Sequence, residues 1–358
     1  MTGQRRKRAR LLARLTPRLS PEEASFARRG FEPCDTAVRR HLEAIVATFI
    51  SGFNAARRES DDAALAGWLR ESFHPHWVGF AFEGAGAARA AEDLVTPWRS
   101  RRLETFTHGT AADHDYIATV GAGLALARLP FAARWLDRYS RTIDPLLAWC
   151  VADGVGFYHG MFRHRSAIGR CAAPPAYLSA AERQLFDAGL GRSLWWVEGA
   201  SPERIRGAIA RFPAARQAEL WCGVGLACAY AGGVGAQALR TLLAHAGAAR
   251  SDLLSGVPFA CRLRQKGANP SAMTDLAAQI LLASDAETCA QFLVDLQSAV
   301  FAEAGGDEGR VRAHGYGEIR RRLVEALSAG ALPPFTRPGF MGPQRIDKLT
   351  PYQHRERI

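Results

Sequence analysis

One short segment of the chain gathers three side chains suited to proton transfer. Asp153, Tyr158 and His159 supply a carboxylate, a phenol and an imidazole within seven residues, among glycines and aromatic residues. Histidine titrates nearest to neutral pH, and a carboxylate can orient its ring. We therefore predict that His159 acts as acid or base, steadied by Asp153 or Tyr158. The alternative is a hydrogen-bonded core histidine, with Asp153 as a helix cap.

Two further acids lie among bulky apolar residues. Glu83 follows two phenylalanines, and Glu198 follows two tryptophans and a valine. A carboxylate in such surroundings must pair with a cation or take up a proton. Arg192 and Arg128 are the predicted partners. The plain structural alternative is a pair of buried Glu–Arg bridges.

These groups predict a site in an apolar cavity near the interface of two halves of the chain. Such a cavity would be lined by aromatic side chains and a few polar groups. The alternative for each aromatic residue, considered by itself, is that it packs in the core. The predicted catalytic residues are His159, Asp153, Tyr158 and Glu83. The predicted substrate-binding residues are Arg192, Glu198, Tyr230, Phe157, Trp195 and Trp221, with Trp196 and Phe259 as further candidates for the lining.

No local motif indicates a metal or a nucleotide. His74 and His76 are two residues apart across a proline, and His159 and His164 do not have the i, i+4 spacing of a zinc-binding helix. Gly223-Val224-Gly225 lacks the third glycine and the preceding strand of a dinucleotide fingerprint. We predict no metal, leave the cofactor undetermined, and interpret the glycines as points of close contact between helices.

The chain shows an internal similarity. The segment Val120–Arg128 matches Cys222–Tyr230 at an offset of 102 residues, and Gly154–Phe157 matches Gly256–Phe259 at the same offset. A repeat this long predicts two similar halves about a pseudo-twofold axis, with an insertion near residues 105–114 of the first half.

Apolar residues recur with helical spacing through most of the chain, so we predict a mainly α fold. Asp35 and Ser201 are predicted helix caps. The predicted organisation is a basic tail (1–18), a first helical half (19–166), a second helical half (176–330) and a proline-rich extension (331–358).

The net charge of +11 is concentrated at the two ends of the chain. Residues 1–18 carry seven cations and no acid, residues 335–358 carry a net +3, and only +1 remains between them. We therefore expect no nucleic-acid binding by the fold. Seven cysteines without a CxxC pair favour a reducing compartment, so we expect a cytoplasmic protein. Peripheral membrane contact through residues 1–18 is an open alternative.

Several motifs together resemble a known bacterial family. They are Phe26–Phe31, Gly79–Ala85, Asp153–Gly160, Gly189–Trp195, Leu220–Gly233 and the Asn269-Pro270 element. The chain resembles, from about Arg10 to Arg322, the domain-of-unknown-function family encoded beside the iterative polyene polyketide synthase in enediyne gene cassettes. Cys222 departs from the small hydroxyl residue expected there. The resemblance implies a role in converting a linear polyene into an enediyne-type core alongside other cassette proteins. It implies no catalytic residue.

Three functions follow as expectations. The first is an enzyme that acts on a long apolar polyene or polyketide intermediate inside a helical cavity. The second is a non-catalytic carrier of such an intermediate, or a scaffold for cassette proteins. The third is an adaptor at the membrane surface.

Overall fold

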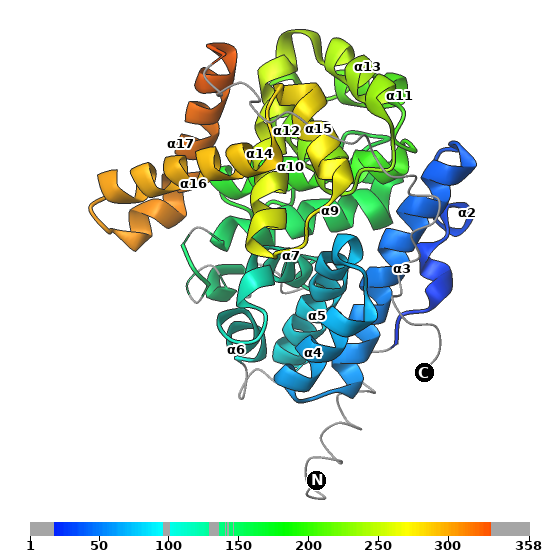
Figure 1. The fold of residues 1–358 in the computed structure, drawn as a ribbon, viewed down its shortest axis with the longest axis vertical. Coiled ribbons are helices and arrows are strands. Elements are labelled where there is room, and N and C mark those ends of the chain that lie inside the picture. Colours follow the sequence, from blue (N-terminus) through cyan, green and yellow to red (C-terminus); the bar gives the residue numbers. More distant parts are fainter. Residues whose placement is uncertain are drawn as a thin grey trace, which may run out of the picture.

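The computed structural model describes residues 18–95, 101–128, 136–139, 141, 143–145 and 147–330. Within these residues the regular structure is helical, which confirms the mainly α prediction (Figure 1). The helices are α2 (Phe26–Arg29), α3 (Thr36–Arg58), α4 (Asp62–Ser72), α5 (Pro75–Val95), α6 (Arg102–His108), α7 (Asp115–Leu126), α9 (Ala148–Ala167), α10 (Ala180–Val197), α11 (Pro202–Ala210), α12 (Ala214–Tyr230), α13 (Ala236–Ala246), α14 (Arg250–Lys266), α15 (Ala272–Leu282), α16 (Ala286–Glu303) and α17 (Glu308–Ser328).

Side-chain caps fix where several helices begin. Asp35 accepts hydrogen bonds from the backbone N–H groups of Ala37 and Val38 at the start of α3. Ser201 accepts one from the Arg204 N–H at the start of α11, ahead of a first-turn proline. Both predicted caps are confirmed. Such bonds satisfy N–H groups that have no partner inside the helix.

Seven helices form a series in which each packs against the next: α3, α5, α7, α9, α10, α12 and α14. A pair of glycines two residues apart makes these contacts. In α7, a Cβ on Gly121 would lie 2.1 Å from the Glu83 carbonyl oxygen of α5, and one on Gly123 would lie 2.1 Å from the Val151 carbonyl oxygen of α9. The first glycine therefore faces the preceding helix and the second faces the following one.

The same arrangement recurs at every step of the series. The glycines against the preceding helix are Gly84, Gly121, Gly154, Gly189, Gly223 and Gly256, and those against the following helix are Gly52, Gly86, Gly123, Gly156, Gly191 and Gly225. Residues two apart on a helix point in nearly opposite directions, so one pair serves two neighbours. The prediction that the glycines allow close helix contact is confirmed.

A glycine pair occurs once in each of α5, α7, α9, α10 and α12, and α3 and α14 each carry one contact glycine. The first members of the pairs, at positions 84, 121, 154, 189 and 223, are 33 to 37 residues apart. The 102-residue offset between Gly121 and Gly223 therefore spans three helix-to-helix steps. The division into two halves about a twofold axis stays a prediction, and its expected seam lies between α9 and α10, which pack closely through Gly156 and Gly189.

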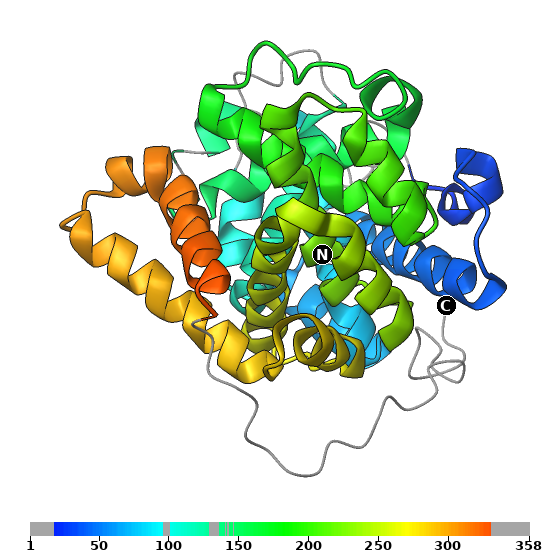
Figure 2. The ribbon, with the colours of Figure 1, turned by 90° about the horizontal axis from the view of Figure 1, so that it is seen from above.

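The remaining helices lie around this series. In both views α16 and α17 project at one side of the body, and α2 lies at the other side, where α3 begins the series (Figures 1 and 2). A second, smaller apolar cluster joins α16 and α17 to the body, and it includes Trp149, Leu293 and Leu323. Polar contacts reinforce this junction, because the Tyr316 hydroxyl donates to Glu219 Oε2 at 2.7 Å and Arg320 pairs with Asp252 at 2.9 Å.

Candidate functional site

Two apolar cavities lie inside the series of helices. Cavity 1 encloses about 780 Å³ and cavity 2 about 660 Å³, counting space that is open to solvent. Cavity 1 is lined mainly from α7, α9, α10, α12, α14 and the α16–α17 junction, and cavity 2 from α3, α5, α7, α9, α10 and α12.

The two cavities share four lining residues, Ile117, Arg192, Leu226 and Tyr230. We call these four residues the waist. On α7, α9, α10 and α12 the residues that line only cavity 1 come earlier in the sequence than those that line only cavity 2. Cavity 1 therefore lies toward the N-terminal part of each of these four helices and cavity 2 toward the C-terminal part, with the waist between them. We call the two adjacent cavities together the lumen.

A buried ion pair lies at the waist. Arg192 Nη2 of α10 is 2.6 Å from Asp153 Oδ1 of α9, and the guanidinium lies over the Phe157 ring at 4.6 Å. The two charged groups are close, but they are not aligned for a hydrogen bond, because Arg192 Nη2 and Asp153 Oδ1 have no hydrogen-bond partner. Arg192 Nε also has no hydrogen-bond partner. Burial raises the pKa of Asp153, and the attraction of Arg192 opposes this shift.

Glu83 of α5 lies in cavity 2 close to this pair. Its side chain is buried, and its Oε1 atom has no hydrogen-bond partner. Burial raises the pKa of Glu83 to about 7, with the Asp153 charge adding to the shift and the Arg192 charge opposing it. Near neutral pH this carboxyl therefore exchanges readily between its protonated and ionised forms.

Tyr230 closes the waist from the α12 side. Its ring packs edge-on against Phe80 at 5.1 Å, and the Arg264 guanidinium lies 4.1 Å from the ring centroid. A Cβ at Gly79 would lie 2.1 Å from the Tyr230 hydroxyl, so only glycine leaves room for the phenol there. Burial raises the pKa of Tyr230, which keeps the phenol protonated.

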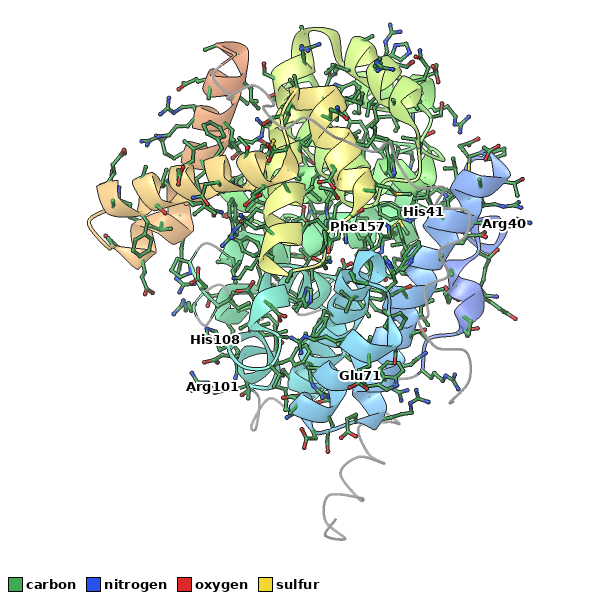
Figure 3. All side chains as sticks on the ribbon, viewed as in Figure 1. Arg40, His41, Glu71, Arg101, His108 and Phe157 are labelled. Carbon is green, nitrogen blue, oxygen red and sulfur yellow. The ribbon has the colours of Figure 1, made fainter. Side chains whose placement is uncertain are left out.

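Five of the predicted site residues come together at this lumen: Glu83, Asp153, Arg192, Tyr230 and Phe157. Figure 3 places Phe157 in the middle of the molecular outline and Glu71 near its lower edge. Phe157 packs edge-on against Trp196 in the wall of cavity 2, at 5.4 Å between ring centroids. Phe259 lines cavity 1, as expected. Arg192 pairs with Asp153 rather than with Glu83 or Glu198.

His159 and Tyr158 line neither cavity. The His159 ring packs edge-on against Phe186, and burial together with Arg163 lowers its pKa to about 4, which leaves it neutral at pH 7. Tyr158 stacks on the exposed ring of Phe162 at 4.7 Å. Asp153 lies inside α9 and is not a cap. The structure therefore does not bring His159 to the acids of the lumen, and its catalytic role stays a prediction.

Four other predicted residues also lie away from the lumen. Trp195 is buried and donates its indole N–H to the Gly232 carbonyl at 2.8 Å, and Trp221 is buried in the core. Glu198 ends α10, where burial and the Glu32 charge raise its pKa. Arg128, proposed as a partner for the acids, is exposed.

Several lining residues were not predicted from the sequence: Tyr116, Trp149, Cys150, Arg262 and Tyr316 in cavity 1, and Arg29 and Phe49 in cavity 2. The glycine pairs could have identified part of this lining. In all five glycine pairs, the residue just before the first glycine lines the lumen. In four of the five pairs, the residue three positions after the first glycine also lines it. Glu83 and Asp153 occupy the first of these positions, and Arg192 occupies the second.

In the described part of the chain, no group of three or more His, Cys, Asp and Glu side chains is arranged to hold a metal ion. No helix among the described residues is long and apolar enough to cross a membrane.

The sequence places the chain in a protein family. It belongs to the family described as "Protein of unknown function (DUF1702)", whose model matches residues 7–326. Neither a curated protein nor a solved structure matches the chain.

Proposed function

We propose that this protein binds a long apolar small molecule in the lumen and transfers a proton to or from it through Glu83. One observation carries the proposal: a buried carboxyl with an unpaired oxygen borders a mainly apolar cavity beside a buried ion pair. A carboxyl without a partner is costly in a purely structural role. Strongly shifted groups in cavities are enriched at functional sites.

The pKa of about 7 suits Glu83 to general acid–base chemistry. An acid or base is most efficient when its pKa lies near the working pH. Arg192 would stabilise negative charge that develops on a ligand at the waist, and Asp153 holds the guanidinium there.

The proposed ligand is a linear polyene or polyketide intermediate, and the proposed setting is enediyne-type biosynthesis with other cassette proteins. The elongated form of the lumen and its aromatic walls support the ligand class. The biosynthetic setting follows from the resemblance of the sequence motifs alone.

The second candidate is a non-catalytic carrier or scaffold. The scarcity of polar groups in both cavities favours it, because an apolar chain needs only apolar walls to be shielded from water. A carrier would bind the same ligand but would leave it unchanged.

The two candidates differ in what Glu83 does. We would analyse metabolites of a host that expresses the polyene synthase with the wild-type protein, with Glu83→Gln, or with neither. Binding would be followed separately with diphenylhexatriene, an uncharged conjugated triene whose fluorescence increases in apolar surroundings. The matched control is Glu71→Gln, which changes an exposed acid on α4.

An enzyme predicts a new product with the wild type and the control, and loss of that product with Glu83→Gln while the triene still binds. A carrier predicts triene binding and unchanged polyene in every host. Product formation that survives Glu83→Gln would remove Glu83 from the mechanism.

A further inference from the structure

We infer that the ligand carries one uncharged oxygen group, a carbonyl or a hydroxyl, near the middle of its chain, and that this group lies between Glu83 and Arg192. The inference rests on the proposed function and defines its substrate class more narrowly.

The middle position follows from the course of the lumen along α9. This helix contributes Trp149 and Asp153 to cavity 1 and Phe157 and Phe162 to cavity 2. The distance from Trp149 to Phe162 along the helix is about 20 Å at the α-helical rise of about 1.5 Å per residue. The polar groups lie between aromatic side chains on both sides. An elongated ligand that fills both cavities therefore meets them with its interior, not with its end.

The need for an oxygen group follows from unpaired atoms at the waist. Glu83 Oε1 and Arg192 Nε are buried, and neither has a hydrogen-bond partner. Buried polar atoms in folded proteins nearly always have a partner, and leaving one unpaired costs about 1–3 kcal/mol. A ligand oxygen would accept from Arg192 Nε–H. It would also accept from Glu83 in the protonated form or, as a hydroxyl, donate to the ionised form.

The absence of a net charge on the group follows from the charges already present. Arg192 and Asp153 neutralise each other at 2.6 Å, and the protonated form of Glu83 adds no charge. A carboxylate would bring an unbalanced negative charge into this buried place, close to Asp153. While Glu83 is protonated, an ammonium would bring an unbalanced positive charge close to Arg192. Both are expensive in an apolar interior.

The competing arrangement is a chain with a carboxylate at its end. Arg262 lines only cavity 1, and Arg29 lines only cavity 2, where it also pairs with Glu23. Either cation would attract a terminal carboxylate. An end-bound acid would leave Glu83 and Arg192 Nε without partners.

Ligands with chains of nineteen carbons separate the two arrangements. We would displace bound diphenylhexatriene with 10-nonadecanone, 2-nonadecanone and nonadecanoic acid, each delivered from cyclodextrin. The central ketone should displace the triene at about tenfold lower concentration than the terminal ketone, because one well-made buried hydrogen bond is worth about 1 kcal/mol or somewhat more. Equal potency of the two ketones, or the highest potency for the acid, would overturn the inference.

Variants of Glu83 show whether the preference arises at the waist. Glu83→Leu should bind the triene but lose much of the preference for the central ketone, and Glu83→Gln should retain more because its amide can still donate. The matched control, Glu71→Gln, changes an exposed acid on α4 and should retain the whole preference. A preference unchanged in Glu83→Leu would refute the placement. A wild-type protein that binds no triene would refute the proposed function itself.

Discussion

Gly123 of α7 and Gly154 of α9 lie directly against each other. A Cβ built on Gly123 would be 2.7 Å from the Gly154 Cα atom, and one built on Gly154 would be 2.9 Å from the Gly123 Cα atom. Real Cβ atoms do not approach other atoms so closely, so both positions require glycine. The backbones of the two helices meet here without side chains between them, and the larger side chains of both helices are left for other faces.

Substitution of a contact glycine should destabilise the fold strongly. In Gly123→Ala the new methyl group would lie 2.1 Å from the Val151 carbonyl oxygen, and backbone cannot move aside cheaply. We expect a loss of about 3 kcal/mol or more in the free energy of unfolding, at the upper end for an overpacked core. Gly67→Ala on α4 is the control. It meets no atom within 4 Å and should stabilise the protein by about 0.5–1 kcal/mol. Urea unfolding measures both, and similar effects would contradict the packing argument.

The buried Glu83 carboxyl should make stability depend on pH. Its pKa is raised from an ordinary value of 4.5 to about 7, so the folded state holds a proton that the unfolded state releases. The resulting penalty is absent below pH 4.5, grows between pH 4.5 and 7, and is complete above pH 7 at about 3 kcal/mol. The melting temperature of Glu83→Gln relative to wild type should therefore rise from pH 4.5 to pH 8. Glu71→Gln should show no such trend, and a flat difference for Glu83→Gln would be evidence against a protonated carboxyl.

Removal of one partner of the waist ion pair should cost more than removal of both. Arg192→Met leaves Asp153 buried without its cation, a change typically worth about 3–5 kcal/mol. The double variant Asp153→Leu/Arg192→Met removes both charges and should recover most of that loss. Chemical unfolding at pH 7 provides the comparison. Additive losses would mean that the two residues do not act as a pair.

Filling the waist should block the lumen. Leu226 lines both cavities, and Leu226→Trp places a larger ring between them. We expect at least a tenfold weaker affinity for diphenylhexatriene, which corresponds to about 1.4 kcal/mol. The melting temperature reports whether the variant is folded. A folded variant with undiminished affinity would show that the probe binds elsewhere.

The basic N-terminal segment should be dispensable for folding. The polar contacts of the body already include Leu19, whose backbone N–H and C=O pair with the Asn54 side chain at 3.0 and 2.9 Å. Residues 1–17 lie outside the described part of the chain. A variant without them should keep its circular dichroism spectrum and melting temperature. Sedimentation with anionic liposomes, compared with the full chain, tests the membrane alternative, and equal sedimentation would exclude a role for this segment.

Local signals in the sequence were sufficient to predict where helices form, but not which face of each helix borders the lumen. Asp35 and Ser201 were correctly predicted as caps because a cap depends on neighbouring residues alone. Asp153 and His159 were grouped because they are close in sequence. Six residues along a helix correspond to a rotation of about 240° at about 3.6 residues per turn, so only one of the two can face the lumen.

The waist also depends on long-range packing. Glu83, Asp153 and Arg192 come from three different helices, and only the order of packing brings them together. The spacing of the glycine pairs in the sequence indicates this order of packing. However, two matching blocks 102 residues apart favoured the prediction of one long repeat over a repeat of 33 to 37 residues. Adjacent tryptophans show the same limit: Trp196 lines cavity 2, whereas Trp195 bonds to the Gly232 carbonyl in the core.

The residues that pack the helices together differ from the residues whose side chains would contact a ligand. Helix spacing depends on contacts between glycines and backbone atoms, whereas the side chains of Glu83, Asp153 and Arg192 line the lumen. A change at one of those positions can alter what the lumen accepts and leave the helices where they are. Relatives built on the same glycine pairs could thus bind chemically different molecules within one unchanged framework.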